Sequence, residues 1–165
     1  MESHVLGRAT TPHQCDTILS VAMRTVQNRD AEVERAVLSY VSAWNETDPD
    51  KLSGFLEDCW TEQGILVSNY ETILGRRALF ERIIRFRRDN PGTRVLLTSG
   101  IEQHHDYFRF TLIQVKQDGR CYSPALEVGE IDANGRIDRI VAFFHDLPLP
   151  PDTFPGHLMR REPIV

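Results

Sequence analysis

Two glycine-containing dipeptides divide the second half of this chain into segments that favour paired strands. Asp118-Gly119 and Asn134-Gly135 each lie between segments rich in β-branched and aromatic residues. Such dipeptides supply the positive φ that two-residue hairpin turns require. We therefore predict strands over about 107–116, 121–132 and 136–145, preceded by a strand over about 94–103.

The first half of the chain has helical periodicity instead. A weak pattern predicts a helix over about 13–27, and Asp30 is expected to cap the next helix, which carries Tyr40 and Trp44 on its apolar stripe. Asp48-Pro49 predicts a restart into a short helix, followed by a strand over 64–68 and a third helix over 75–90. Helices followed by an antiparallel meander predict an α+β fold, in which helices cover one face of a single sheet.

Length, charge and cysteine content limit the functions open to the chain. Its 165 residues most simply form one domain, and its net charge of -5 argues against nucleic acid as a general partner. No apolar run approaches the roughly 20 residues that span a bilayer, so no membrane partner is expected. Cys15, Cys59 and Cys121 include no Cys-x-x-Cys pair, which favours reduced thiols in a cytoplasmic protein. Cys59 and Cys121 are expected in the core.

Glu127 is unusual because it interrupts an otherwise apolar predicted strand. Alternate residues of a strand share a face, and on this face Glu127 is flanked by the small residues Ala125 and Gly129, which leave open volume. Burial would favour a neutral carboxyl group, which donates a hydrogen bond. The opposite parity, with Leu126 and Val128 inside, would place Glu127 on the surface.

Several segments together resemble the nuclear transport factor 2-like superfamily, and most of all its SnoaL-like and ketosteroid-isomerase-like branches. They are YVSAWNETD, LGRRALFERI, EVGEIDANGRI and IVAFF, and the resemblance covers about residues 30–146. We therefore expect a SnoaL-like cone domain (30–146), with an N-terminal arm and extra helix (1–29) and a proline-rich C-terminal tail (147–165) that the resemblance does not explain. The resemblance implies a cystatin-like, cone-shaped antiparallel sheet wrapped around the N-terminal helices, an apolar pocket inside, and a homodimer formed through the open sheet face.

The resemblance also implies roles for Tyr40 and Glu127. In ketosteroid isomerases a helix tyrosine and a strand aspartate donate hydrogen bonds to an oxyanion. Tyr40 matches that tyrosine by position, and Glu127 matches that aspartate. Ser68-Asn69 stands where these isomerases have an aspartate base, and neither side chain can take a carbon-bound proton at neutral pH.

A substitute base is therefore predicted elsewhere. His105 beside Asp106 can form an oriented acid–base pair, although the same residues also suit a polar turn. Tyr70, Glu71 and His145 are expected near the pocket mouth or rim. The substrate-binding residues are predicted to be Trp44, Ser68, Asn69, Phe80, Phe110 and Phe144. The six arginines of the third helix fit either a solvated face or an anion or partner site.

Two functions follow. The first is a cofactor-free isomerase, cyclase or dehydratase that acts on a small hydrophobic oxygenated molecule, such as a polyketide or terpenoid, through Tyr40, Glu127, His105 and Asp106. The second is a non-catalytic ligand-binding or dimerisation module. No metal is predicted, because His104 and His105 are adjacent and cannot point the same way on a strand.

Overall fold

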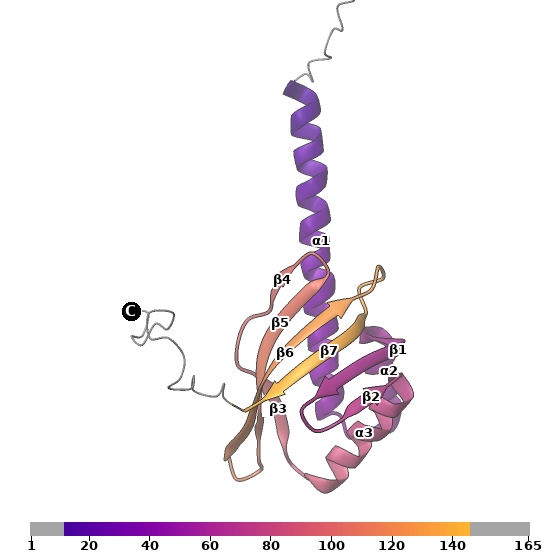
Figure 1. Cartoon of the computed structure of the whole chain (residues 1–165), viewed down its shortest axis with the longest axis vertical. Coiled ribbons are helices and arrows are strands. Elements are labelled where there is room, and N and C mark those ends of the chain that lie inside the picture. The colour runs from indigo at the N-terminus through magenta and orange to yellow at the C-terminus, as the bar shows by residue number, and fades with distance from the viewer. Residues whose placement is uncertain (1–11, 146–165) are drawn as a thin grey trace, which may run out of the picture.

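Three helices pack against one face of a curved sheet in the computed structural model (Figure 1). The structure describes the backbone of residues 12–145 and the side chains of residues 28–145. The helices are α1 (Pro12–Asn45), α2 (Pro49–Cys59) and α3 (Arg76–Asp89). The strands are β1 (Trp60–Ser68), β2 (Thr72–Leu74), β3 (Arg94–Leu97), β4 (Glu102–His104), β5 (Tyr107–Val115), β6 (Cys121–Ile131) and β7 (Ile137–Phe144). The predicted N-terminal arm before residue 12 and the proline-rich tail lie outside the described residues.

The α+β class is confirmed, with one departure in the sheet. The seven strands run in the order β2-β1-β7-β6-β5-β3, and β4 pairs with β5. Strand β1 pairs with β7 in parallel, with Leu66 opposite Ile140, so the sheet is mixed rather than wholly antiparallel as expected. No hairpin joins these two strands, and their relative direction is therefore not set by any local turn signal.

The predicted break between two helices at Asp30 is wrong, because α1 runs through this residue. The two predicted helices form one helix of 34 residues, whose first half projects beyond the sheet (Figure 1). The Asp30 carboxylate accepts a hydrogen bond from the Gln103 side chain instead of capping a helix. The sequence has no glycine and no second proline between Pro12 and Asn45, so nothing in it interrupts the helix.

Both predicted hairpins are present, but their turns differ from the expected two-residue type. Only the glycines have positive φ, 85° at Gly119 and 71° at Gly135. The Gly119 amide donates to the Lys116 carbonyl oxygen at 2.9 Å, and the Gly135 amide donates to the Asp132 carbonyl oxygen at 3.1 Å. Each loop is thus a four-residue turn that ends on a left-handed glycine, a common alternative to the two-residue turn.

The inner face of β6 has the predicted parity. Ala125, Glu127 and Ile131 are buried, whereas the residues between them are only half-buried. Gly129 lies on the same face, where an added Cβ would come within 2.8 Å of the Arg139 carbonyl oxygen. Glu127 therefore points into the protein beside a residue that must stay small.

The cysteines have different environments. Cys59 is buried in the core as predicted, and burial raises the pKa of its thiol to about 12. Cys121 is exposed, contrary to prediction, because it is the first residue of β6 after an exposed hairpin. Among the described residues, no helix has the length and apolar character needed to cross a membrane.

Candidate active site

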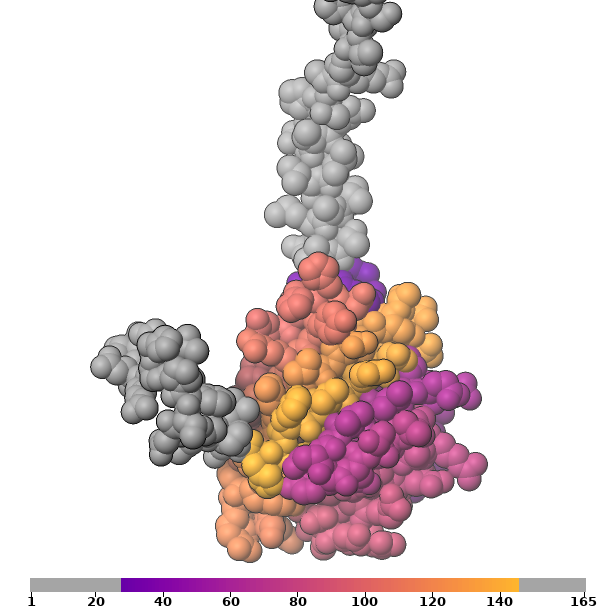
Figure 2. All heavy atoms as spheres, in the orientation of Figure 1, coloured from indigo at the N-terminus to yellow at the C-terminus, as the bar shows by residue number. Residues whose placement is uncertain are grey.

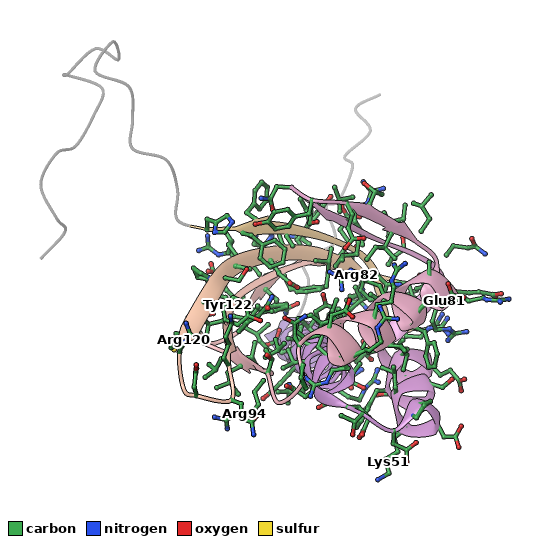
Figure 3. All side chains as sticks on the ribbon, turned by 90° about the horizontal axis from the view of Figure 1, so that it is seen from below. Lys51, Glu81, Arg82, Arg94, Arg120 and Tyr122 are labelled. Carbon is green, nitrogen blue, oxygen red and sulfur yellow. The ribbon has the colours of Figure 1, made fainter. Side chains whose placement is uncertain are left out.

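A cavity of about 260 Å³ lies between α1, α3 and the inner face of the sheet. Its inner end is formed by the buried residues Tyr40 and Glu127, and half-buried Trp44 lines it next to Tyr40. Its apolar walls are Leu66, Phe86, Val95, Leu112, Ala142 and Phe144. Its remaining lining is polar and consists of Ser68, Tyr70, Glu71, Arg82, Asn90, Gln114, Tyr122 and Ser123. Figure 3 shows Arg82 on α3 and Tyr122 on β6 on the concave side of the curved sheet.

Glu127 and Tyr40 meet at the buried end of this cavity. Glu127 is 3% exposed and Tyr40 is 1% exposed. Burial raises the pKa of Glu127 from 4.5 to about 8, and the nearby Tyr40 hydroxyl partly opposes that rise. The Glu127 atom Oε2 is buried without a hydrogen-bond partner. The Glu127 carboxyl group is therefore protonated at neutral pH and can act as a donor.

The Tyr40 hydroxyl also stays protonated. Burial raises the pKa of Tyr40 well above 10, the nearby Glu127 charge raises it further, and the neighbouring Trp44 side chain lowers it. The Tyr40 ring stacks on Trp60 at 5.6 Å between centroids and meets Trp44 edge-on at 6.3 Å. These aromatic contacts fix the ring. The inner end of the cavity thus holds two neutral donors in an apolar setting.

Ser68 closes the turn after β1. Its hydroxyl donates to the Glu71 carbonyl oxygen at 3.1 Å, and it accepts from the amides of Tyr70 at 3.2 Å and Glu71 at 3.1 Å. Because these three contacts occupy the hydroxyl, Ser68 shapes the turn that places Glu71 at the cavity wall.

Glu71 is the other carboxylate of the cavity wall and, unlike Glu127, it is partly exposed. It pairs with Arg82 at 2.5 Å, and the Arg82 guanidinium lies 5.9 Å from the centroid of the Trp44 ring. The structure therefore places a carboxylate three residues after Ser68, near the end of β1 where the base was expected. In the arginine-rich helix, Arg77 and Arg88 lie on the exposed face, as the solvated-face interpretation expects, whereas Arg82 lines the cavity paired with Glu71.

His105 and Asp106 do not reach this cavity, so their predicted placement beside Tyr40 and Glu127 is wrong. They line a separate surface hollow, where Asp106 pairs with Arg29 at 2.7 Å. Arg29 precedes Tyr40 in α1 by eleven positions, about 16 Å along the helix axis. The β4–β5 turn that carries both residues thus lies far from the inner end of the cavity.

Only three of the six predicted binding residues line the cavity. Trp44, Ser68 and Phe144 line the cavity. Phe110 is buried edge-on against Tyr40 at 6.5 Å and does not line it. Phe80 faces a different hollow beside α2, because it lies on another side of α3 from Arg82. Asn69 is exposed in the turn after β1 and is absent from the lining.

Five polar cavity residues were not predicted as part of the site: Arg82, Asn90, Gln114, Tyr122 and Ser123. Arg82 follows buried Leu79 by three positions, a spacing that places both on one side of a helix and could have identified it. Gln114 and Tyr122 face each other across β5 and β6 just beyond a register shift at Leu112, so simple alternation does not predict their direction.

The structure shows no preformed metal site in residues 28–145. No group of three or more His, Cys, Asp or Glu side chains there is close enough together to hold a metal ion.

No protein-family model matches the chain, and no curated protein matches it. Solved structures do share its fold. A candidate isomerase of the SnoaL-like family from Agrobacterium tumefaciens has a TM-score of 0.66 and 24% identity, over 70% of this chain and 99% of its own. A protein of unknown function with a cystatin-like fold, from Methylobium petroleophilum, has a TM-score of 0.59 and 18% identity, over 81% and 97%.

A third similar structure is a candidate polyketide cyclase from Sinorhizobium meliloti, with a TM-score of 0.52 and 15% identity, over 65% of this chain and 92% of its own. At these identities the similarity shows the fold. The chain has the nuclear transport factor 2-like, cystatin-like fold, and the resemblance seen in the sequence is confirmed at that level.

Proposed function

We propose that the protein is a cofactor-free enzyme of the isomerase, cyclase or dehydratase type that acts on a small, hydrophobic, oxygenated molecule. The observation that carries this proposal is the pair of buried neutral donors, Tyr40 and Glu127, at the closed end of a mainly apolar cavity. At about 260 Å³, the cavity is slightly smaller than the usual range for small-molecule sites, about 300–1,000 Å³, and fits a small ligand.

Both donors would stabilise negative charge that develops on a substrate oxygen. Fixed donors in a water-excluded site need no reorganisation during the reaction, and each typically contributes about 100-fold to 1,000-fold in rate. A substrate carbonyl oxygen placed between Tyr40 and Glu127 would become enolate-like with this support.

Glu71 takes the role of base in this proposal. Its carboxylate would remove a proton from the carbon next to the carbonyl group, and the electrons of the C–H bond would move to the carbonyl oxygen. Return of the proton to another carbon isomerises the substrate, attack of the enolate carbon on a second carbonyl closes a ring, and loss of a β-hydroxyl as water dehydrates it. Arg82 binds one oxygen of Glu71, Oε1, and the step would use the other.

Proton exchange on a simple ketone tests the proposal without the natural substrate. We expect the protein to accelerate deuterium incorporation next to the carbonyl of 2-tetralone in D₂O, followed by NMR. Tyr40→Phe should slow this exchange about 100-fold, and Glu71→Gln should abolish the acceleration. Tyr107→Phe, an exposed tyrosine outside the cavity, is the matched control. A rate in Tyr40→Phe equal to that of wild type would refute the proposed role of the donors.

A non-catalytic ligand-binding module is the second candidate. It is supported by the two residues at the place where the base was expected. The Ser68 hydroxyl is hydrogen-bonded within its turn, and the Glu71 carboxylate is paired with Arg82. In that case 2-tetralone would bind without any exchange above the rate in buffer. Binding with no acceleration in wild type would favour this second function.

We also propose that two copies pair through the outer face of the sheet. Strands β1, β7 and β6 form a continuous surface there (Figure 2). Phe143 is 53% exposed on this face, and its half-exposed apolar neighbours are Ile65, Val67, Leu126, Val128 and Val141. A contiguous apolar surface of this kind is typical of an interface.

A further inference from the structure

The outer part of the cavity contains polar groups that the proposed chemistry leaves unused. Tyr122 lines the cavity from β6, opposite Gln114 on β5, and Asn90 faces them from the end of α3. The Tyr122 hydroxyl is buried and has no hydrogen-bond partner. A buried hydroxyl without a partner is unfavourable, so an arriving hydrogen-bonding group would be favoured there.

Tyr122 is held in a defined place. Its ring lies 4.9 Å from the Lys116 ammonium nitrogen, a cation–π contact that restrains the side chain. It precedes Glu127 by five positions on β6, which corresponds to at most about 16 Å of extended strand. The cavity therefore has unpartnered polar atoms at two separate places, Glu127 Oε2 at its inner end and the Tyr122 hydroxyl farther out.

The charges of the cavity nearly cancel. Its lining includes the cation Arg82, which is already paired with the carboxylate of Glu71 at 2.5 Å. Glu127 is neutral at pH 7 because burial raises its pKa to about 8. The groups that line the cavity beside Tyr122, namely Asn90, Gln114 and Ser123, are uncharged, and Lys116, which contacts the Tyr122 ring, does not line the cavity. An anionic ligand would find no unpaired cation in this lining, and its burial would therefore be costly.

We propose that Tyr122 is a specificity-determining residue, and that the ligand is an uncharged molecule with two oxygens, one bound by Tyr40 and Glu127 and the second bound by Tyr122. This inference rests on the proposed function for the position of the first oxygen. It adds three properties of the ligand: a second oxygen, an apolar segment between the two oxygens, and no net charge.

Three phenols with one skeleton test the inference, since a phenol oxygen can stand in for an enolate oxygen. 4-Butylphenol has one oxygen, 4-(3-hydroxypropyl)phenol has a second hydroxyl in place of the terminal methyl, and 3-(4-hydroxyphenyl)propanoate has a carboxylate. Affinities would be measured by NMR titration of the intact protein at pH 7. The hydroxypropyl compound should bind about 10-fold more tightly than 4-butylphenol, and the propanoate should bind more weakly than the hydroxypropyl compound.

Variants separate this inference from the proposed function. Tyr122→Phe should reduce the affinity for the hydroxypropyl compound to that for 4-butylphenol, whereas Tyr107→Phe should change neither. Equal binding of the two compounds by wild type, or a preference that survives in Tyr122→Phe, would overturn the inference alone, provided that Tyr40→Phe still weakens every phenol. Tighter binding of the propanoate than of the hydroxypropyl compound would overturn the claim that the ligand is uncharged. If no phenol binds, or if Tyr40→Phe weakens none, the proposed function fails as well.

Discussion

Replacing Glu127 by glutamine should change how the free energy of unfolding depends on pH. The folded protein holds the Glu127 proton up to about pH 8, whereas a glutamate in the unfolded chain releases it near 4.5. Between these values the folded state binds one more proton than the unfolded state. Stability contributed by this group is therefore fully present below pH 4.5 and is lost as pH rises toward 8.

The size of the effect follows from the shift. Each pH unit between the two pKa values costs about 1.4 kcal/mol of unfolding free energy, so the rise from 4.5 to about 8 corresponds to about 5 kcal/mol. Glutamine has nearly the same shape and carries no proton to release. The variant should therefore gain stability relative to wild type as pH rises, and the gain should level off above about pH 8.

Urea unfolding followed by the fluorescence of Trp44 and Trp60 measures this difference from pH 5 to 9. Taking the difference between variant and wild type removes the contributions of the other titrating groups. Glu130→Gln, on the outer face of the same strand, is the matched control for the substitution itself. A difference between Glu127→Gln and wild type that stays constant across this range would refute the claim that Glu127 is buried and neutral.

Four further predictions follow from the same contacts. Proton exchange on 2-tetralone should fall as pH rises through about 8 in wild type but not in Glu127→Gln, because ionised Glu127 cannot donate. Gly129→Ala should lower the free energy of unfolding in urea by about 1–3 kcal/mol, because the added Cβ would overlap the Phe108 ring and the Arg139 carbonyl oxygen. Ser68→Ala should cost about 1 kcal/mol in the same assay, because two turn amides lose their acceptor. Phe143→Glu should shift sedimentation from dimer to monomer; a wild-type monomer would contradict the proposed interface.

Much of the fold could be predicted from local signals. The hairpin glycines and the Asp48-Pro49 helix start each act over a few residues, and they predicted the second helix and the last three strands, but not β2 or the division of the predicted 94–103 strand into β3 and β4. The alternation around Glu127 left both faces of β6 open, and the family resemblance decided between them. The parallel pairing of β1 with β7 could not be predicted in this way, because these strands are more than 60 residues apart and no turn connects them. The continuity of α1 was missed because an aspartate such as Asp30 is typical of a helix N-cap but is also tolerated inside a continuous helix. The residue type alone therefore does not mark a break.

The site was predicted less completely for a related reason. Tyr40 and Glu127 lie on regular elements, where the helix and strand periods leave few side-chain directions, and the family resemblance decided which face of β6 is the inner one. His105 lies in a turn. Its imidazole suggested a base, but whether it reaches the cavity depends on which end of the sheet that turn occupies, and the sequence does not specify this. Tyr122 lies beside a bulge, where alternation is interrupted.

A crystal structure of the protein with 4-butylphenol tests the central claim most directly. The phenol oxygen should lie within about 2.5–3.0 Å of both the Tyr40 hydroxyl and a Glu127 carboxyl oxygen, with the butyl chain directed toward Tyr122. A phenol bound in the cavity with its oxygen turned away from Tyr40 and Glu127, or bound only outside the cavity, would contradict the account.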